Sequence, residues 1–186
     1  MTAYPHVVVI GAGTLGLWTA TNLVEQGARV TVLDGQAIAS GSSGRSVGVV
    51  GTQFTDPFEL MLLGHAIPRF RELENLGLRF NHIGYLRLAR TQEQMALFEK
   101  SVTMQAELGF RSRVYQADDL KELVPHIDTD GLAGGIFGPD DGFIDPHEMC
   151  MLLSERLRGR GAVIRQFCKV TDVERRPGGG LDDRRP

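Results

Sequence analysis

The sequence predicts an α/β protein with a doubly wound, Rossmann-like nucleotide-binding domain and a second, smaller α+β part. An apolar strand pattern at His6–Ile10 runs into a glycine-rich turn and then into a helical pattern. A second strand pattern, Arg29–Leu33, ends at an acidic residue, Asp34. Several of the 23 glycines lie between Gly11 and Gly51. Strand, glycine turn, helix and strand within about thirty residues are typical of the opening unit of a parallel, doubly wound sheet.

The first elements follow from these patterns. His6–Ile10 is expected to be a fully buried strand, because four consecutive β-branched residues stop at Gly11. Apolar residues at helical spacing predict a helix over 14–26, with Gly27 as its C-terminal cap. The strand at Arg29–Leu33 should then pair in parallel with the first one, through a right-handed crossover. Residues 36–51 are small, polar and without a period, so we interpret them as an ordered binding loop.

The middle of the chain contains three helical patterns and one strand. Asp56-Pro57 is a cap followed by a first-turn proline, and the helix it opens should reach Leu76, with Pro68 kinking or dividing it. A strand is expected at Ile83–Ala89. The other two expected helices begin at Thr91, ending before Gly109, and at Ala117, ending at Val124.

The last third continues with short elements. The sequence predicts a strand at 132–137, a turn at 138–142, a helix from Asp145-Pro146 to about Leu157, and strands at 162–164 and 169–174. The tail, 175–186, is glycine, proline and charge, so we expect it to be disordered.

Composition excludes several classes of function. A net charge of -3 and a pI near 5.9 argue against a nucleic-acid-binding surface. Cys150 and Cys168 have no metal-ligand spacing, so no disulfide or metal site is expected, and a reducing cytoplasm fits best. The apolar run Val7–Ile10 is far too short for a membrane span and lacks a basic leader.

The strongest motif is Val7–Gly16, in which three glycines stand where a strand meets a helix. Gly11 permits a tight turn, Gly13 lets a pyrophosphate approach the backbone, and Gly16 allows close packing of helix on strand. The helix N-terminus at Thr14 and Leu15 offers free N–H groups to phosphate.

An acid at the end of the second strand should bind the ribose hydroxyls of a dinucleotide. Asp34 has that position, although it could instead be a surface turn acid before Gly35. A carboxylate there repels a 2′-phosphate, which leaves FAD or NAD rather than NADP.

The second glycine-rich loop, Ser40–Gly48, favours FAD, because a long cofactor needs a second clamp. Alternatively, the loop is a flexible Ser/Gly linker. Its hydroxyls and N–H groups could hold the pyrophosphate and place the flavin. The candidate cofactor ligands of this region are Ser42, Ser43, Arg45, Ser46, Gly48 and Val49.

Together, these residues resemble the FAD-dependent amino-acid oxidoreductases of the D-amino acid oxidase superfamily, near glycine oxidase and the sarcosine oxidase β-subunit. The resemblance spans roughly residues 6–174. It also rests on Gly84–Leu88, on Gly138–Pro146 and on Gly161-Ala162 leading to Val170, whose backbone contacts the adenosine half of FAD in such proteins. It implies an FAD-binding domain at 1–80 and 146–174, and a partial substrate domain at 81–145.

The resemblance implies oxidation of a small amine or amino acid by hydride transfer to the flavin. Tyr85 and Arg87 would lie on a strand that roofs the substrate. Arg45 stands where some relatives carry a histidine that bonds the flavin, so non-covalent FAD is expected. Gly51 replaces an arginine that is expected in many relatives, which affects the surroundings of the flavin ring.

The chain stops where members of the family are about half complete, before most substrate ligands, so no catalytic residue is assigned. We therefore expect the isolated chain to be inactive, as a truncated product, a gene fragment or one piece of a split assembly. Two alternatives remain at this point: a non-catalytic flavin-binding subunit whose partner chain supplies the missing half, and an NAD-dependent dehydrogenase.

Overall fold

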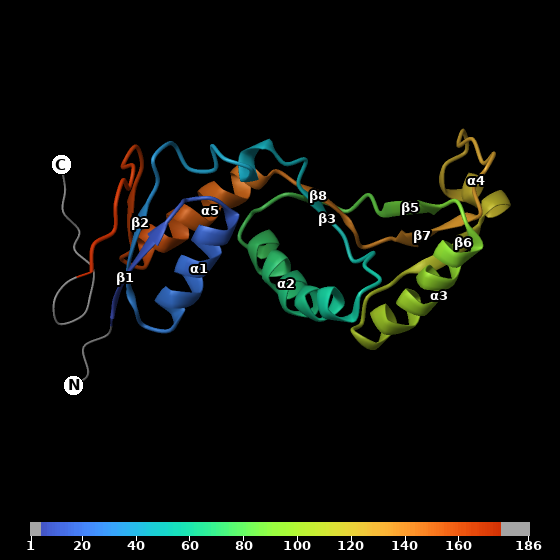
Figure 1. The fold of residues 1–186 in the computed structure, drawn as a ribbon, viewed down its shortest axis with the longest axis horizontal. Coiled ribbons are helices and arrows are strands. Elements are labelled where there is room, and N and C mark those ends of the chain that lie inside the picture. Colours follow the sequence, from blue (N-terminus) through green and yellow to red (C-terminus); the bar gives the residue numbers. More distant parts are fainter. Residues whose placement is uncertain (1–4, 176–186) are drawn as a thin grey trace. The chain divides into compact units, whose positions relative to one another are not determined.

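A computed structural model describes residues 5–175 and divides into two compact units (Figure 1). Unit 1 contains Met1–Ser46 and Pro146–Pro186, and unit 2 contains Val47–Asp145. The chain thus returns to unit 1 at the position where the sequence places the second domain boundary. Residues 47–80, assigned from the sequence to the cofactor domain, group with unit 2. The functional domain assignment itself stays a prediction.

The sheet of unit 1 is parallel. It consists of β1 (His6–Ile10), β2 (Arg29–Leu33) and β9 (Val163–Arg165), in the order β1-β2-β9. Val8 is opposite Thr31, and Thr31 is opposite Val163 on the other side. The predicted parallel pairing of the first two strands is confirmed.

Two helices, α1 (Thr14–Glu25) and α5 (Pro146–Gly159), lie side by side in unit 1 (Figure 1). Helix α1 ends as the sequence predicts, because Gly27 adopts a φ of 87° that favours glycine. The buried apolar side chains of unit 1 come from both helices and from the sheet: Leu17, Ala20, Val30, Val32, Leu153 and Leu157.

The expectation that β1 is fully buried is wrong. Ile10 is 61% exposed, and the rest of the strand is exposed or half-buried, whereas Val30 and Val32 of β2 are buried. Strand order explains the difference, because β2 lies between two partners while β1 bonds only to β2 among residues 5–175.

The prediction of a strand at 169–174 is also wrong, since residues 166–174 contain no strand. Phe167 has a φ of 56°, a left-handed conformation that interrupts an extended ladder. The N–H of Cys168 nevertheless donates to the carbonyl of Asp34, which holds this segment against the end of β2. Residues 176–186 of the expected disordered tail lie outside the described residues.

Unit 2 contains two small antiparallel sheets. One has the order β3 (Val49–Val50), β8 (Gly142–Ile144), β4 (Phe80–Asn81), and the other β5 (Tyr85–Ala89), β7 (Gly134–Gly138), β6 (Arg113–Gln116). The expected strands at 83–89 and 132–137 are confirmed with shifted bounds. Strands β3, β4, β6 and β8 are too short to show a period in the sequence.

The helices of unit 2 are α2 (Pro57–Asn75), α3 (Gln92–Glu107), and the short 3₁₀ and α turns η2 (Ala117–Asp119) and α4 (Leu120–Leu123). Asp56 caps α2 by accepting from the N–H groups of Phe58 and Glu59. Helix α2 runs through Pro68 without being divided. Helix α3 covers the β5-β7-β6 sheet through a cluster of Ala89, Met95, Phe98 and Ile136. Within 5–175, no helix has the length and apolar character needed to cross a membrane.

Candidate functional site

Unit 1 contains an open cleft of about 550 Å³ at the carboxyl end of β1. It is formed by the glycine turn, the first turn of α1, and the 3₁₀ turn η1 (Ser43–Arg45) with its neighbours. The residues that line this unit 1 cleft are Ile10, Gly11, Gly13, Thr14, Leu15, Gly16, Ser42, Ser43 and Ser46.

Each of the three motif glycines has a separate structural requirement. Gly11 has a φ of 105°, which side chains disfavour. A Cβ at Gly13 would lie 2.9 Å from the hydroxyl oxygen of Ser43. A Cβ at Gly16 would lie 1.9 Å from the carbonyl oxygen of Gly11, so no other residue permits this packing of helix on turn. The cleft therefore keeps a bare backbone at the start of α1.

The second loop is fixed against the first. The N–H of Ala39 donates to the carbonyl of Ala12 at 3.1 Å, and the N–H of Thr14 donates to Oγ of Ser43 at 3.0 Å. Gly44 permits this arrangement, since a Cβ there would lie 2.2 Å from the carbonyl oxygen of Ala39. The loop is thus ordered on the glycine turn, unlike a flexible linker.

Asp34 braces the glycine turn from the end of β2. Its Oδ2 accepts the N–H of Ala12 at 2.7 Å, and its Oδ1 accepts the N–H of Gln36 at 2.8 Å. Carboxylate oxygens have two lone pairs each, so both atoms can accept a further hydrogen bond. Asp34 is half-buried and bonded to the turn, which differs from an unattached surface acid.

Among the residues that the structure describes, no charged side chain lines the unit 1 cleft. An anion there would be held by helix N–H groups, the positive end of the α1 dipole and serine or threonine hydroxyls. At the back of the site the hydroxyl of Thr14 lies 3.8 Å from Sγ of Cys150, and burial raises the pKa of that thiol. Cys150 is fully buried.

The structure gathers eight of the predicted cofactor ligands in the cleft and places the others elsewhere. Asp34 reaches the turn through Ala12, and Arg45 donates to the carbonyl of Ser40 at 3.3 Å. A Cβ at Gly35 would lie 3.4 Å from Cβ of Lys169, so the segment that leads to Val170 lies against Gly35. The remaining two, Gly48 and Val49, belong to unit 2.

In unit 2, one cavity of about 640 Å³ lies between α2 and the strands β3 and β5; we call it the Arg87 pocket. The guanidinium of Arg87 donates to the carbonyl of Gln53 and lies 5.6 Å from the ring centre of Phe98. The residues that line this pocket are Val49, Val50, Gly51, Gln53, Phe54, Thr55, Glu59, Leu63, Phe70, Tyr85 and Arg87.

A buried carboxylate that the sequence analysis missed connects β3 with the turn between β7 and β8. Asp141 is 2% exposed; its Oδ1 accepts the N–H and hydroxyl of Thr52, and its Oδ2 accepts Nε2 of Gln53 at 2.8 Å. Burial raises the pKa of Asp141, while these bonds oppose the rise. The only sequence feature at this position is a pair of adjacent acids within Gly138–Gly142. That pattern is typical of an exposed turn and does not indicate a buried carboxylate.

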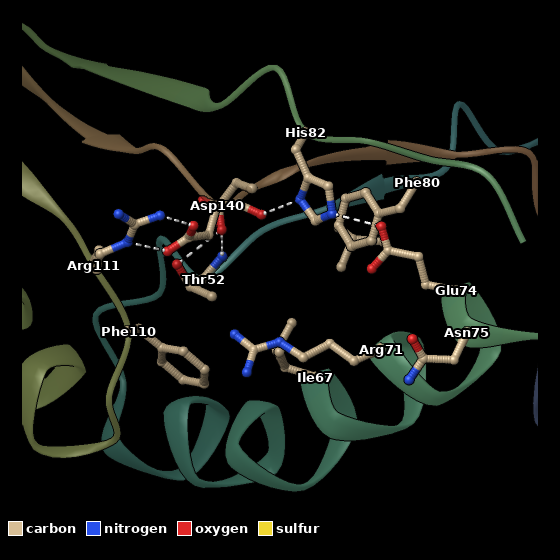
Figure 2. Close-up of a pocket in the computed structure, with 12 residues that line it drawn as sticks. Thr52, Ile67, Arg71, Glu74, Asn75, Phe80, His82, Phe110, Arg111 and Asp140 are labelled. Carbon is tan, nitrogen blue, oxygen red and sulfur yellow. Dashed lines mark hydrogen bonds and ion pairs between the residues drawn. The ribbon is translucent and has the colours of Figure 1, made fainter.

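A second cavity of unit 2, the Arg71 pocket, lies beside α2 (Figure 2). Its lining residues are Val50, Thr52, Ile67, Arg71, Glu74, Asn75, Phe80, His82, Phe110, Arg111, Asp140 and Asp141. His82 connects its two sides: Nε2 lies 2.9 Å from Oε1 of Glu74, and Nδ1 lies 3.0 Å from the carbonyl oxygen of Asp140. No sequence pattern indicates this cluster, because its members come from separate segments of the chain.

The His82 contacts predict a pH-dependent contribution to stability. The hydrogen bond to the carbonyl of Asp140, aided by Glu74, raises the pKa of His82 above the usual 6.5. Stabilisation is therefore complete below pH 6.5 and is lost as the pH rises through the folded-state pKa. Since the imidazole is 43% exposed, we expect only a few tenths of a kcal/mol.

The measurement compares the melting temperatures of the native chain and His82→Gln between pH 5.5 and pH 8.5. The difference between them should shrink as the pH rises. His126→Gln, an exposed histidine of the same unit, is the control and should show no such trend. A difference between native and His82→Gln that grows with pH would contradict the assignment.

Comparison with known proteins gives one family for nearly the whole chain. A family model described as FAD dependent oxidoreductase (DAO) matches residues 6–184. Sarcosine dehydrogenase of Mus musculus is 30% identical over 174 residues, which are 90% of this chain and 19% of that protein. Dimethylglycine dehydrogenase of Rattus norvegicus is 28% identical over 186 residues, 97% of this chain and 22% of that protein.

Solved structures have the same fold. L-proline dehydrogenase from P. horikoshii matches with a TM-score of 0.83 and 26% identity, over 94% of this chain and 47% of that one. Glycine oxidase from Bacillus cereus ATCC 14579 matches with a TM-score of 0.69 and 25% identity, over 92% and 48%. The predicted α/β fold class is confirmed. The chain spans about half the length of these solved chains and about a fifth of the two dehydrogenases.

Proposed function

Since the chain belongs to the DAO family of FAD-dependent oxidoreductases, we propose that the unit 1 cleft holds the pyrophosphate of FAD and that the protein serves the oxidation of a small amine or amino acid. The family defines FAD as the cofactor, which leaves the NAD-dependent dehydrogenase without support. Relatives named for sarcosine, dimethylglycine and glycine support the substrate class.

One observation carries the cofactor site: the bare backbone at the start of α1. Gly13 and Gly16 leave no side chain between a phosphate and the helix N–H groups. The N–H of Thr14 is not free as expected but donates to Oγ of Ser43, so a phosphate oxygen would replace that hydroxyl as its acceptor. Asp34 would accept the ribose hydroxyls with its remaining lone pairs, and the segment ending at Val170 would contact the adenosine.

When bound, FAD supplies the electron-accepting chemistry. The residues of this chain would bind and orient the cofactor. The N–H groups and hydroxyls of the unit 1 cleft would hold its phosphates by hydrogen bonds, without a cationic side chain. The Arg87 pocket is our candidate for the part of the substrate site that unit 2 contributes. Its Tyr85 hydroxyl and Arg87 guanidinium would bind the carboxylate of an amino acid. Gly51 lines the same pocket, and a Cβ there would lie 3.3 Å from the Tyr85 ring.

Flavin attachment is proposed to be non-covalent. Arg45 occupies the loop position at which a histidine bonds the flavin in some relatives, and a guanidinium does not form that bond. Acid precipitation of the flavin-loaded chain should therefore release all the yellow colour into the supernatant. Colour retained in the protein pellet would contradict this proposal.

The cofactor site is tested by placing a charge in the cleft without disturbing the fold. Leu15 lines the cleft and is 85% exposed, so Leu15→Glu should leave the melting temperature unchanged. The new carboxylate would repel the pyrophosphate, and we expect FAD affinity to fall by roughly 10-fold or more. Flavin fluorescence quenching measures the affinity, and Leu15→Gln is the neutral control of equal size.

Two results would overturn the proposed cofactor site. One is a folded chain with no affinity for FAD. The other is equal FAD affinity for Leu15→Glu and Leu15→Gln, because the cleft would then not contain the phosphates.

A second candidate is a non-catalytic flavin-binding part that acts with a further segment or a partner chain. This candidate is supported by coverage, because the chain spans only about half the length of the two solved chains. Turnover by this polypeptide alone, loaded with FAD, tests the second candidate, which predicts no steady oxidation of sarcosine or glycine; an inactive fragment of the first candidate predicts the same. Sustained turnover would favour the first.

A cytoplasmic location remains a proposal. It rests on Cys150 and Cys168, both of which are free thiols. The two dehydrogenases above are named as mitochondrial proteins, so the location of relatives does not decide it.

A further inference from the structure

The Arg71 pocket has the size and the charge pattern of a second ligand site. Its volume is about 440 Å³, within the range of about 300–1,000 Å³ that ligand pockets have. Every residue that lines it belongs to unit 2, and none of them lines the unit 1 cleft. The pocket and the cleft therefore share no lining residue.

The carboxylates of the pocket are already engaged. Glu74 bonds His82 at 2.9 Å, and both oxygens of Asp140 accept from the guanidinium of Arg111. That pairing holds the pKa of Asp140 below its usual range, so it stays ionised near neutral pH. Asp141 accepts its three hydrogen bonds from Thr52 and Gln53, which follow β3. These groups leave no unpaired acid to attract a cationic ligand.

Arg71 is different, because among residues 5–175 its guanidinium makes no hydrogen bond or ion pair. Its charge is felt across the pocket, where it contributes to the lowered pKa of Asp140. In Figure 2 the side chain extends from α2 toward Phe110 and Thr52, into the cavity. A guanidinium offers five N–H donors in a fixed plane and prefers a carboxylate that accepts two of them.

Part of the pocket wall is apolar and flat, with Phe110 beside the guanidinium and Phe80 beside His82 (Figure 2). Phe110, Phe80 and Ile67 line the pocket together with Arg71. The Phe80 ring is held in place by stacking on His82, with ring centres 4.0 Å apart and planes 16° apart. A flat apolar group would lose its hydration against these rings.

We propose that the Arg71 pocket binds a small organic monocarboxylate with a flat apolar body, its carboxylate on the Arg71 guanidinium and its body against Phe110. A second negative charge on the ligand is disfavoured, because the other basic groups of the pocket are already paired, Arg111 with Asp140 and His82 with Glu74. Phosphate and dicarboxylates should therefore bind more weakly.

The test is a ¹⁹F NMR titration of the full chain with 4-fluorophenylacetate, with and without saturating FAD. Binding should be saturable and equal in both states. Arg71→Gln should weaken it roughly 10-fold or more, since a hydrogen-bonded charge pair is lost. The neutral 4-fluorophenylacetamide should bind the native chain as weakly as the acid binds Arg71→Gln. Arg79→Gln, an exposed arginine that lines none of the three cavities described above, is the matched control and should bind like the native chain.

Three results would overturn the proposal: equal affinity for the native chain and Arg71→Gln, equal affinity for acid and amide, or loss of binding in Arg87→Gln with Arg71→Gln unaffected. The last result would place the acid in the Arg87 pocket. Arg71→Lys keeps the charge without the planar donors, so an intermediate affinity supports the proposed contact. Because Arg71 is exposed, the melting temperatures of these variants should match the native value.

Discussion

Gly16→Ala is expected to lower the free energy of unfolding by about 3 kcal/mol and to remove FAD binding. The added Cβ would lie 1.9 Å from the carbonyl oxygen of Gly11, and backbone atoms cannot move aside as a flexible side chain does. The helix must shift away from the strand, which displaces the N–H groups that face the cleft. Urea unfolding and flavin fluorescence measure the two effects.

Gly41→Ala is the matched control for this variant. It lies in the same unit and in the second loop, and a Cβ there would meet nothing within 4 Å. Its stability and FAD affinity should stay close to native values. A Gly16→Ala protein as stable as Gly41→Ala would contradict the described packing of α1 on the glycine turn.

Asp141→Ala is expected to destabilise unit 2 by about 3 kcal/mol or more. The change leaves the N–H of Thr52 and the amide of Gln53 buried without an acceptor, and each such group costs about 1–3 kcal/mol. Thermal unfolding followed by circular dichroism measures the loss. Asp118→Ala, an exposed acid of the same unit, should change stability by less than about 0.5 kcal/mol.

Asp141→Asn separates hydrogen bonding from charge at this position. The asparagine oxygen can still accept from Thr52, and its amide can donate to Oε1 of Gln53, which has no hydrogen-bond partner in the structure, once the Gln53 amide turns. Burial also disfavours the ionised aspartate, as its raised pKa shows. We therefore expect Asp141→Asn to be much milder than Asp141→Ala, and equal losses would show that the charge itself is required.

The elements of unit 1 were predictable because each one has a signal in its own short stretch of sequence. Strand, glycine turn and helix each have a period or a stop signal, and Asp34 follows directly from the end of the second strand. The burial of β1 was not predictable in this way. It depends on which strands lie beside it, and β9, the neighbour of β2, is more than a hundred residues away along the chain.

Unit 2 shows the opposite case. Its long helices were visible from their caps at Asp56 and Thr91, but two-residue strands have no period that a sequence can show. Its cavities depend on side chains that converge from distant segments, as with Thr52 and Asp141, which are 89 positions apart. The turn at 138–142 was correctly located, yet nothing local indicated that one of its acids is buried.

The outer edge of β1 has a consequence for how the polypeptide is handled. Among residues 5–175, β1 pairs with another strand on one side only, and a strand added on the other side would also cover Ile10. Such edges act as templates for intermolecular pairing. Concentrated preparations of this polypeptide should therefore self-associate through main-chain bonds, and a short lysine-flanked peptide that adds to this edge would keep them dispersed.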